Sequence, residues 1–286
     1  MATMEVSAFA KLNLTLDVLG AREDGYHELR MVMQSVSLHD TITLETGTGR
    51  GLTVETDKEF LPTDERNLAA AAALRFCEAT GVDLGGLALR IEKRIPVCAG
   101  MAGGSTDAAA VLRALNQMTG VNLPVEQLAE IGERVGSDVP YCVLGGTALA
   151  EGRGERLTPL PPLPKCHLVL CKPAFPVSTP ELFGRIDSVK LRCRPDTAGM
   201  LEALERQDLE GVARRLYNVF EDVLPERKAA EIASIRNSLI QFGALGACMS
   251  GTGPTVFGIF DDPAAAHAAW EELSVSYRDT FLTQVV

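Results

Sequence analysis

The chain lacks the apolar stretches and leader features that mark membrane-spanning and exported proteins. No apolar run approaches the roughly 20 residues that a membrane-spanning helix requires. The N-terminus, MATMEVSAFAKLNL, has no basic region followed by an apolar core, so it is not predicted to be a signal peptide. We therefore expect a cytoplasmic protein with no membrane partner.

Metal-binding patterns are also missing. The seven cysteines stand apart at positions 77, 98, 142, 166, 171, 193 and 248, and no pair forms C-x-x-C. The four histidines show no H-E-x-x-H spacing. This pattern is typical of reduced thiols in the cytosol rather than of a disulfide framework or a zinc site. No metal site built by the protein itself is expected.

Positive charge is in deficit. The chain carries 38 Asp and Glu against 27 Lys and Arg, which gives a formal net charge of −11. Such a balance disfavours a broad electrostatic grip on nucleic acid. A small molecule that carries phosphate is compatible with it, provided that local amides, cations or a metal ion assist. We expect small-molecule substrates, no nucleic-acid partner, and a monomer or weak homodimer.

Aromatic residues make up only 5% of the chain, but hydrophobic residues reach 46% and support a substantial core. The 286 residues suit two modest domains or one large domain. The segment LTPLPPLPK holds four prolines between Thr158 and Lys165, and such a run cannot continue a helix or a central strand. We place a domain junction here, dividing residues 1–158 from 159–286. A long surface loop is the alternative.

The spacing of apolar residues predicts an α+β protein. Asn67 is expected to cap the first helix. In the first half we expect strands at 6–18, 29–38, 87–91 and 147–151, a hairpin made by 41–45 and 51–55, and helices at 68–80, 106–118 and 125–135. In the second half we expect strands at 167–171, 247–250, 255–260 and 281–285, and a helix at 263–273.

The standard nucleotide-binding motifs are absent, but a related feature is present. A P-loop needs Lys directly after its last glycine, whereas Gly104 is followed by Ser105, and the glycines do not fall as G-x-G-x-x-G. Residues 96–115 instead read PVCAGMAGGSTDAAAVLRAL, a glycine-rich turn that runs directly into a helix with one apolar face.

This junction suits an anion. Gly100, Gly103 and Gly104 carry no side chain and permit positive φ, and Ser105 or Thr106 can cap the helix. Free amides at a helix start, with the helix dipole behind them, favour a phosphate group. The alternative is a tight turn before a buried helix, and the spacing alone does not decide between the two.

The segment AFAKLNLTLDVLG places Lys11 and Asn13 on one face of a strand, with Leu12 and Leu14 on the other. A Lys and an Asn that share one face of an apolar strand face either solvent or a ligand. From this segment alone, a solvated strand face is the simpler interpretation.

Three further segments have two interpretations each. Asp138, in GSDVPYCVLGG, is either a turn residue that bonds its own backbone or a carboxylate held at a cleft. The glycine turn at 251–253 is either a simple hairpin or a set of amides for phosphate oxygens. Tyr26 and His27, in DGYH, either pack their loop down or hold a flat ligand ring by stacking and hydrogen bonding.

Together and in this order, these segments resemble the GHMP family of small-molecule kinases. The matching segments are AFAKLNLTLDVLGAREDGYHEL, PVCAGMAGGSTDAAAVLRALN, VGSDVPYCVLGGTALAEGRGE and MSGTGPTVF. The resemblance spans nearly the whole chain, is weakest over residues 190–230, and is specific because four motifs lie in register. It implies a two-domain α+β GHMP kinase fold, with an N-terminal domain like ribosomal protein S5 domain 2 and a ferredoxin-like C-terminal domain.

The resemblance also implies an activity. The chain would be an ATP-dependent small-molecule kinase with an alcohol group as acceptor, and Mg²⁺ would be bound with ATP. The implied acceptor is the 2-hydroxyl of 4-diphosphocytidyl-2-C-methyl-D-erythritol, in the non-mevalonate route to isoprenoid precursors.

The resemblance implies a role for each matching residue. Lys11 and Asp138 match the catalytic lysine and aspartate, and Asn13 matches a polar group close to the reacting hydroxyl. The residues that hold cytosine are matched by Tyr26, His27 and, more loosely, Phe183. Asn67 falls where the family approaches the adenine of ATP. The ATP phosphate loop is matched by Pro96, Val97, Cys98, Ala99, Gly100, Met101, Ala102, Gly103, Gly104, Ser105 and Thr106.

One position departs from the family pattern. Where the family has Gly-Leu-Gly-Gly-Gly-Ser-Ser, this chain has Gly-Met-Ala-Gly-Gly-Ser-Thr, so Ala102 puts a methyl group where glycine is usual. If that position needs positive φ, the substitution costs about 1 kcal/mol.

Two rival functions are a GHMP kinase for homoserine, mevalonate or a sugar, and a nucleotide-binding regulator without turnover. The DGYH segment favours a cytidyl substrate over the first, and the presence of both Lys11 and Asp138 favours turnover over the second.

Overall fold

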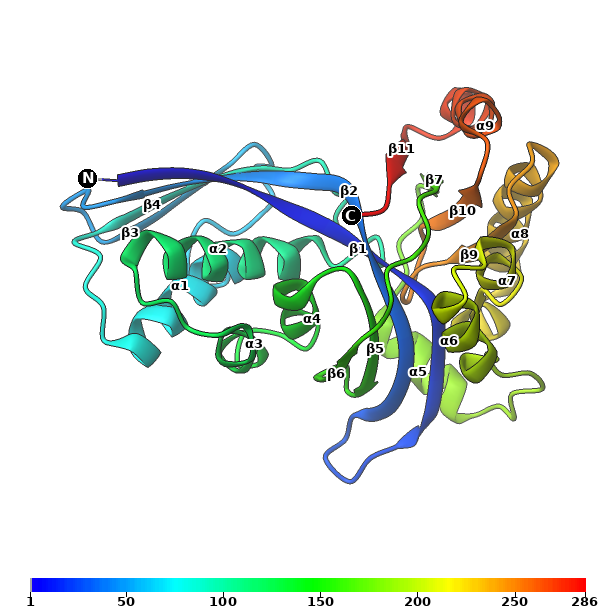
Figure 1. Ribbon diagram of the computed structural model, residues 1–286, viewed down its shortest axis with the longest axis horizontal. Helices are drawn as coiled ribbons and strands as arrows, with labels where there is room; N and C mark the ends of the chain where they lie inside the picture. The colour runs from blue at the N-terminus through cyan, green and yellow to red at the C-terminus, as the bar shows by residue number, and fades with distance from the viewer. Residues whose placement is uncertain (1) are drawn as a thin grey trace. The chain divides into compact units, whose positions relative to one another are not determined.

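The computed structural model describes residues 2–286, whose backbone forms two compact units. The first unit comprises residues up to Ala10, Leu38–Val97 and Ala102–Gly145, and the second comprises Lys11–Ser37, Cys98–Met101 and Gly146–Val286. Two long strands, β1 (Ala2–Ala21) and β2 (His27–Thr46), contribute residues to both (Figure 1). Neither unit is one continuous stretch of sequence, so the division does not correspond to a single boundary along the chain. The domain boundary expected after residue 158 stays a prediction.

In the first unit, helices lie on one side of a sheet (Figure 1). The strands lie in the order β3-β4-β2-β1, with β3 at Leu52–Thr56 and β4 at Leu87–Glu92. Leu87, Leu89 and Ile91 alternate with more exposed residues along β4, so one face of this strand is buried and the other is open. The helices are α1 (Leu68–Thr80), α2 (Gly103–Thr119), α3 (Val125–Glu133) and α4 (Val139–Leu144).

The hairpin expected from residues 41–45 and 51–55 is wrong, because β4 lies between its two strands. Antiparallel pairing joins β2 to β4 from Thr41 to Thr46, and parallel pairing joins β3 to β4 from Leu52 to Thr56. The glycines after β2 carry the turn signal of a hairpin. The sequence does not reveal that the chain returns through α1 in a parallel crossover and inserts β4 between β2 and β3.

The helix starts show one confirmed prediction and one correction. Asn67 caps α1, because its side-chain oxygen accepts the Ala69 N–H at 3.0 Å. Helix α2 begins at Gly103, and its N-cap residue is Ala102, which makes no side-chain capping bond. The expectation that Ser105 or Thr106 caps this helix is therefore wrong. Both residues lie inside its first turn, because the left-handed conformation of Ala102 starts the helix earlier.

The second unit contains a four-stranded antiparallel sheet in the order β11-β7-β10-β9. Helix α8 (Glu226–Gln241) precedes β9, and α9 (Pro263–Ser276) connects β10 to β11. This β-α-β-β-α-β succession is the expected ferredoxin-like arrangement. The strands are β7 (His167–Lys172), β9 (Gly246–Met249), β10 (Val256–Phe260) and β11 (Asp279–Gln284), close to their expected positions.

The proline-rich segment is a packed part of the second unit. Its first proline, Pro159, ends the edge strand β6, where the missing N–H is tolerated. Leu163 is buried, and its N–H donates to the hydroxyl of Thr147 at 3.0 Å. The remaining elements of this unit are β5 (Thr147–Gly152), β6 (Arg156–Pro159), β8 (Tyr217–Asn218), α5 (Thr179–Asp187), α6 (Thr197–Glu205), α7 (Leu209–Ala213) and the 3₁₀ helix η1 (Val219–Val223).

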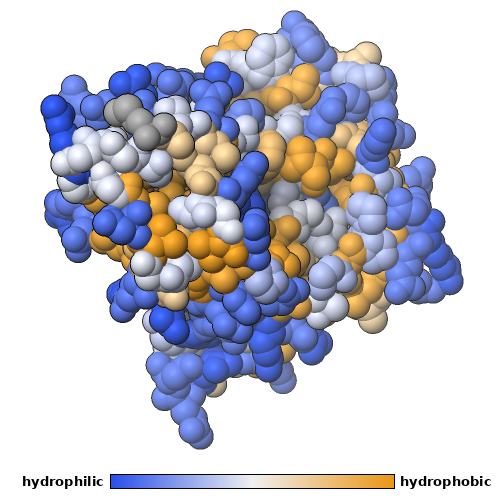
Figure 2. Space-filling view, turned by 60° about the vertical axis from the view of Figure 1, so that its left-hand side comes forward, coloured by the Kyte–Doolittle hydropathy of each residue, from blue (hydrophilic) through white to orange (hydrophobic). Residues whose placement is uncertain are grey.

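On the face shown in Figure 2, polar and charged side chains surround patches of apolar side chains. Large apolar side chains that stay exposed include Phe60 and Val275. Among residues 2–286, no helix has the length and apolar character needed to cross a membrane.

Candidate functional site

Lys11 and Asn13 form a buried polar pair on β1. Their exposed fractions are 4% and 0%, and Lys11 Nζ donates a hydrogen bond to Asn13 Oδ1 at 2.8 Å. The interpretation of this strand face as solvated is therefore wrong. A buried ammonium group requires polar partners to offset its lost hydration, and Asn13 is one of them. The shared face was predictable from the alternation of the strand, but its burial was not.

The turn at residues 98–101 lies against this part of β1. The carbonyl oxygen of Met101 accepts the N–H of Lys11 at 3.3 Å, and that of Ala99 accepts the N–H of Thr255 at 3.3 Å. Gly100 has φ of +77°, and a Cβ atom at this position would lie 2.1 Å from the carbonyl oxygen of Ser250. Both facts require glycine here.

Ser250 joins the two glycine-rich turns. Its hydroxyl accepts the N–H of Asn13 at 3.2 Å and donates to the carbonyl oxygen of Gly100 at 2.9 Å. A Cβ atom on Gly251 would lie 3.0 Å from the same Gly100 oxygen, so the turns pack main chain against main chain. The turn at 251–253 is thus a hairpin that also braces the first glycine turn. Sequence reasoning missed Ser250, whose only signal is a hydroxyl directly before the glycines.

A group of aromatic side chains lies elsewhere in the second unit. The rings of His27 and Phe183 stack at 4.5 Å with 27° between their planes, and His27 Nε2 lies 2.8 Å from a carboxylate oxygen of Asp187. Tyr26 is 52% exposed, and the guanidinium carbon of Arg153 lies 5.0 Å from its ring centroid. His27 is therefore packed down, whereas Tyr26 presents ring surface to solvent. Asp187 and Arg153 were not found by sequence reasoning.

In the first unit, a side chain on either glycine at the start of α2 would lie close to its neighbours. A Cβ on Gly103 would lie 3.2 Å from Lys93 Nζ, and one on Gly104 would lie 3.1 Å from a methyl carbon of Leu68. Ala102 has φ of +57°, so the condition for its expected conformational cost is met.

Beneath this helix start lies a buried ionic cluster that sequence reasoning also missed. Lys93 Nζ donates to Asp107 Oδ2 at 2.7 Å and to Asp40 Oδ2. The other oxygen of Asp40 accepts the N–H groups of Arg94 and Ile95 at 2.6 and 2.8 Å. The three ionic residues come from β2, the segment after β4, and α2, and no local motif connects them.

Burial and charge shift the pKa values of this cluster. Loss of hydration is the largest cause of the rise in the pKa of Asp107 to about 8, and Lys93 opposes that rise. Burial lowers the pKa of Lys93, but the nearby carboxylates of Asp107 and Asp40 more than offset this effect and raise it overall.

Asp138 directly precedes α4 and is half-buried, and its carbonyl oxygen accepts the Cys142 N–H at 3.1 Å. It belongs to the first unit, together with Asn67 and the start of α2, whereas Lys11 belongs to the second unit. The pairing of Lys11 with Asp138 stays a prediction, as do the roles assigned to all of the site residues.

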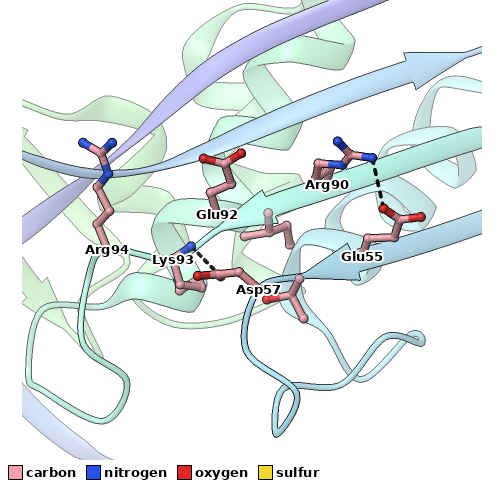
Figure 3. A pocket seen from close by; sticks show the side chains of 8 residues that line it. Glu55, Asp57, Arg90, Glu92, Lys93 and Arg94 are labelled. Atoms are coloured by element: carbon pink, nitrogen blue, oxygen red, sulfur yellow. Dashed lines mark hydrogen bonds and ion pairs between the residues drawn. The ribbon is translucent and has the colours of Figure 1, made fainter.

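A pocket of about 420 Å³ opens beside β3 and β4 in the first unit. Figure 3 shows Arg90 turned toward Glu55, and the N–H of Lys93 bonded to Asp57 at 2.9 Å. No predicted site residue lines this pocket; its lining residues are Glu55, Thr56, Asp57, Arg90, Ile91, Glu92, Lys93 and Arg94. In the described part of the chain, no three or more His, Cys, Asp and Glu side chains are grouped to hold a metal ion.

Two family models match the chain. Residues 67–146 match the GHMP kinases N-terminal domain, and residues 200–279 match the GHMP kinases C-terminal domain.

Relatives match nearly the full length. A protein from Clostridium perfringens named 4-diphosphocytidyl-2-C-methyl-D-erythritol kinase is 45% identical over 285 residues, which cover 99% of this chain and 98% of that protein. A protein of the same name from Alkaliphilus metalliredigens is 44% identical, with 99% and 97% covered.

Solved structures also superpose on the chain over nearly its full length. A crystal structure of 4-(cytidine 5'-diphospho)-2C-methyl-D-erythritol kinase superposes with a TM-score of 0.82 at 34% identity, covering 99% of both chains. A homoserine kinase from Cytophaga hutchinsonii superposes with a TM-score of 0.76 at 18% identity, covering 100% of this chain and 95% of that one. At that identity, the second likeness concerns the fold alone.

Proposed function

Because this chain belongs to the GHMP kinase family, we propose that it phosphorylates the 2-hydroxyl of 4-diphosphocytidyl-2-C-methyl-D-erythritol with ATP. The product would serve the non-mevalonate route to isoprenoid precursors. The observation that carries the proposal is the buried pair of Lys11 and Asn13 beside the turn that contains Gly100 and Met101. A buried ammonium next to a glycine-rich turn suits the phosphoryl end of a nucleotide. The near-full-length identity to the named relatives supports the choice of acceptor.

The glycine-rich segment at residues 96–106 would hold the phosphates of ATP. Main-chain amides at the start of α2 offer donors and the positive end of a helix dipole. Phosphoryl transfer asks the protein mainly for positioning and for stabilisation of charge on the phosphoryl oxygens. Such amides meet that charge without side-chain rearrangement. Asn67 would lie near the adenine.

Asp138 and Lys11 would act on the acceptor hydroxyl. An aspartate has an ordinary pKa near ~3.9, so it is a weak base toward an alcohol at the outset. Asp138 would therefore orient the hydroxyl toward phosphorus and accept its proton late, as the new O–P bond forms. Lys11 would stabilise negative charge on the attacking oxygen, and Asn13 would lie close to that hydroxyl.

Cytosine would be held by the aromatic group of the second unit. The exposed ring of Tyr26 offers a stacking surface, and the stacked pair of His27 and Phe183 would complete the site. Stacking tolerates any base, so hydrogen bonds to the pyrimidine edge must supply the discrimination. Nδ1 of His27 is the ring nitrogen suited to this task, because Nε2 is engaged with Asp187.

The remaining assignments follow from the same proposal. Mg²⁺ would enter with ATP and would neutralise part of the charge on its phosphates. The protein would work in the cytoplasm as a monomer or weak homodimer, with small molecules rather than nucleic acid or membrane as partners.

The test is to incubate the protein with ATP, Mg²⁺ and the cytidyl-erythritol, and to follow the products by phosphorus NMR. The expected result is formation of ADP together with a new phosphomonoester signal on the acceptor. Phosphorylation of homoserine, mevalonate or a sugar in its place would reassign the acceptor. ATP binding without ADP release would favour a regulator and contradict the proposal.

A further inference from the structure

Lys93 precedes the glycine-rich segment, and its ammonium group bonds to the helix that follows the segment. Lys93 lies three residues before Pro96, where the segment begins. Its Nζ donates to Asp107 in α2, and it lies 3.2 Å from the position of a Cβ on Gly103, the first residue of that helix. The residue directly before the segment also approaches the start of α2, because the same Cβ would lie 3.2 Å from a methyl group of Ile95.

Asp40 completes the arrangement from β2. One of its oxygens accepts from Lys93 Nζ, and the other accepts the main-chain N–H groups of Arg94 and Ile95. The carboxylate therefore fixes both the side chain of Lys93 and the backbone that follows it. The exposed fractions of Asp40, Lys93 and Asp107 are 0%, 8% and 4%, so water contributes little to this geometry.

Burying three ionisable groups is a poor way to gain stability, because the loss of hydration opposes the attraction between them. Apolar side chains of similar volume would fill the same space at lower cost. The cluster instead holds three parts of the chain in fixed positions: the end of β4, the start of α2 and the main chain at Arg94 and Ile95.

We propose that Lys93, held by Asp40 and Asp107, is a positioning residue that clamps the two ends of the ATP phosphate loop. This inference rests on the proposed function, which assigns residues 96–106 to ATP. The clamp keeps the amides at the start of α2 in place before the nucleotide arrives, so binding does not have to order them. The cluster lies in the first unit and the residues assigned to cytosine lie in the second, so its loss should weaken the binding of ATP and leave that of the cytidyl substrate unchanged.

The test compares Lys93→Met with Arg90→Met in steady-state kinetics. Methionine keeps much of the volume of lysine and removes the ammonium group. We expect the KM for ATP to rise roughly tenfold to a hundredfold in Lys93→Met, because small displacements of positioning groups have effects of this size. The KM for the cytidyl-erythritol should stay within about twofold of the wild-type value. Arg90 lies on the exposed face of β4, so Arg90→Met should leave both constants unchanged.

A second variant covers the case in which Lys93→Met does not fold, since that change leaves the buried carboxyl groups of Asp40 and Asp107 without their ammonium partner. Asp107→Asn keeps the pair of Lys93 and Asp40 and preserves volume, and we expect a smaller rise in the ATP KM, roughly twofold to tenfold. Lys93→Arg, which keeps the charge, should recover part of the ATP affinity. Calorimetric titration with ATP and Mg²⁺, in the absence of the acceptor, should rank the ATP affinities of these variants in the same order as their KM values.

An ATP KM and an ATP affinity that match wild type in folded Lys93→Met, or in Asp107→Asn where only that variant folds, would overturn the clamp. Equal losses for both substrates would do the same, since they indicate general damage. Failure of the proposed function is a separate outcome, in which the wild-type protein neither binds ATP nor phosphorylates the cytidyl-erythritol.

Discussion

A Cβ atom on Gly100 would lie 2.1 Å from the carbonyl oxygen of Ser250. We therefore predict that Gly100→Ala lowers the free energy of unfolding by about 2–5 kcal/mol, the sum of a left-handed backbone strain and an overpacking cost. The loss should appear in urea denaturation. Gly81→Ala is the matched control, because Gly81 has φ of +70° with no atom within 4 Å of its Cβ position. That variant should lose only about 1–2 kcal/mol, and equal losses would argue against the close contact.

At Ala102 we predict the opposite effect, a substitution that increases stability. Ala102 occupies the left-handed region with φ of +57°, so Ala102→Gly should raise the free energy of unfolding by about 1 kcal/mol. Thermal or urea unfolding checks this. Ala71→Gly, in the interior of α1, is the control and should lower stability by about 1 kcal/mol. A destabilised Ala102→Gly would mean that the methyl group makes packing contacts that outweigh the backbone strain.

Local patterns predicted the parts of the molecule that local forces determine. The cap at Asn67, the turn before α2 and the shared face of Lys11 and Asn13 all follow from residues close in sequence. The insertion of β4 between β2 and β3 does not, because strand pairing depends on a crossover through α1. The hydroxyl of Ser250 and the cluster around Lys93 were missed for the same reason, since their partners lie far away in the chain.

The proposed role of Asp138 predicts a selective loss of turnover. Asp138→Asn should lower kcat by roughly 10²–10⁴-fold, because the amide cannot accept the hydroxyl proton, while the KM values change little. The control is Asp262→Asn at the N-cap of α9, where Asn caps a helix as well as Asp does. It should keep normal kcat. Near-normal turnover in Asp138→Asn would contradict the assignment, provided that both variants unfold at the wild-type temperature.

Tyr26 predicts an effect on base binding that does not depend on the identity of the base. Removing the ring in Tyr26→Ala should cost about 1–3 kcal/mol, or roughly 5- to 150-fold in the KM for the acceptor. Tyr26→Phe keeps the stacking surface and should stay close to wild type. Analogues that carry other bases should weaken in parallel in Tyr26→Ala. A loss confined to the cytidyl substrate would instead indicate a hydrogen bond from the Tyr26 hydroxyl.

The raised pKa of Asp107 predicts a pH dependence of stability. Between its ordinary value of 3.8 and about 8, the folded chain holds a proton that the unfolded chain has released. The stabilising contribution is fully present below that ordinary value and is lost as the pH rises toward 8. Wild-type stability should therefore fall relative to Asp107→Asn over this window, by up to about 1.4 kcal/mol per pH unit.

Urea denaturation at a series of pH values measures this difference. Asp262→Asn, at an exposed position, should follow the wild-type curve. Parallel curves for wild type and Asp107→Asn would mean that Asp107 is ionised in the folded protein throughout this range.

Between the turns at residues 98–101 and 250–253, the main chain at Gly100 packs directly against the main chain at Ser250 and Gly251, and this limits which residues fit there. At Gly100 the steric conflict arises from the Cβ atom itself, so it is the same for every residue that has a Cβ. Glycine is therefore the one amino acid that fits at position 100 without strain, and a small side chain such as alanine already meets the full steric conflict. Substitutions that strengthen this part of the molecule are therefore expected at neighbouring positions rather than at Gly100 itself.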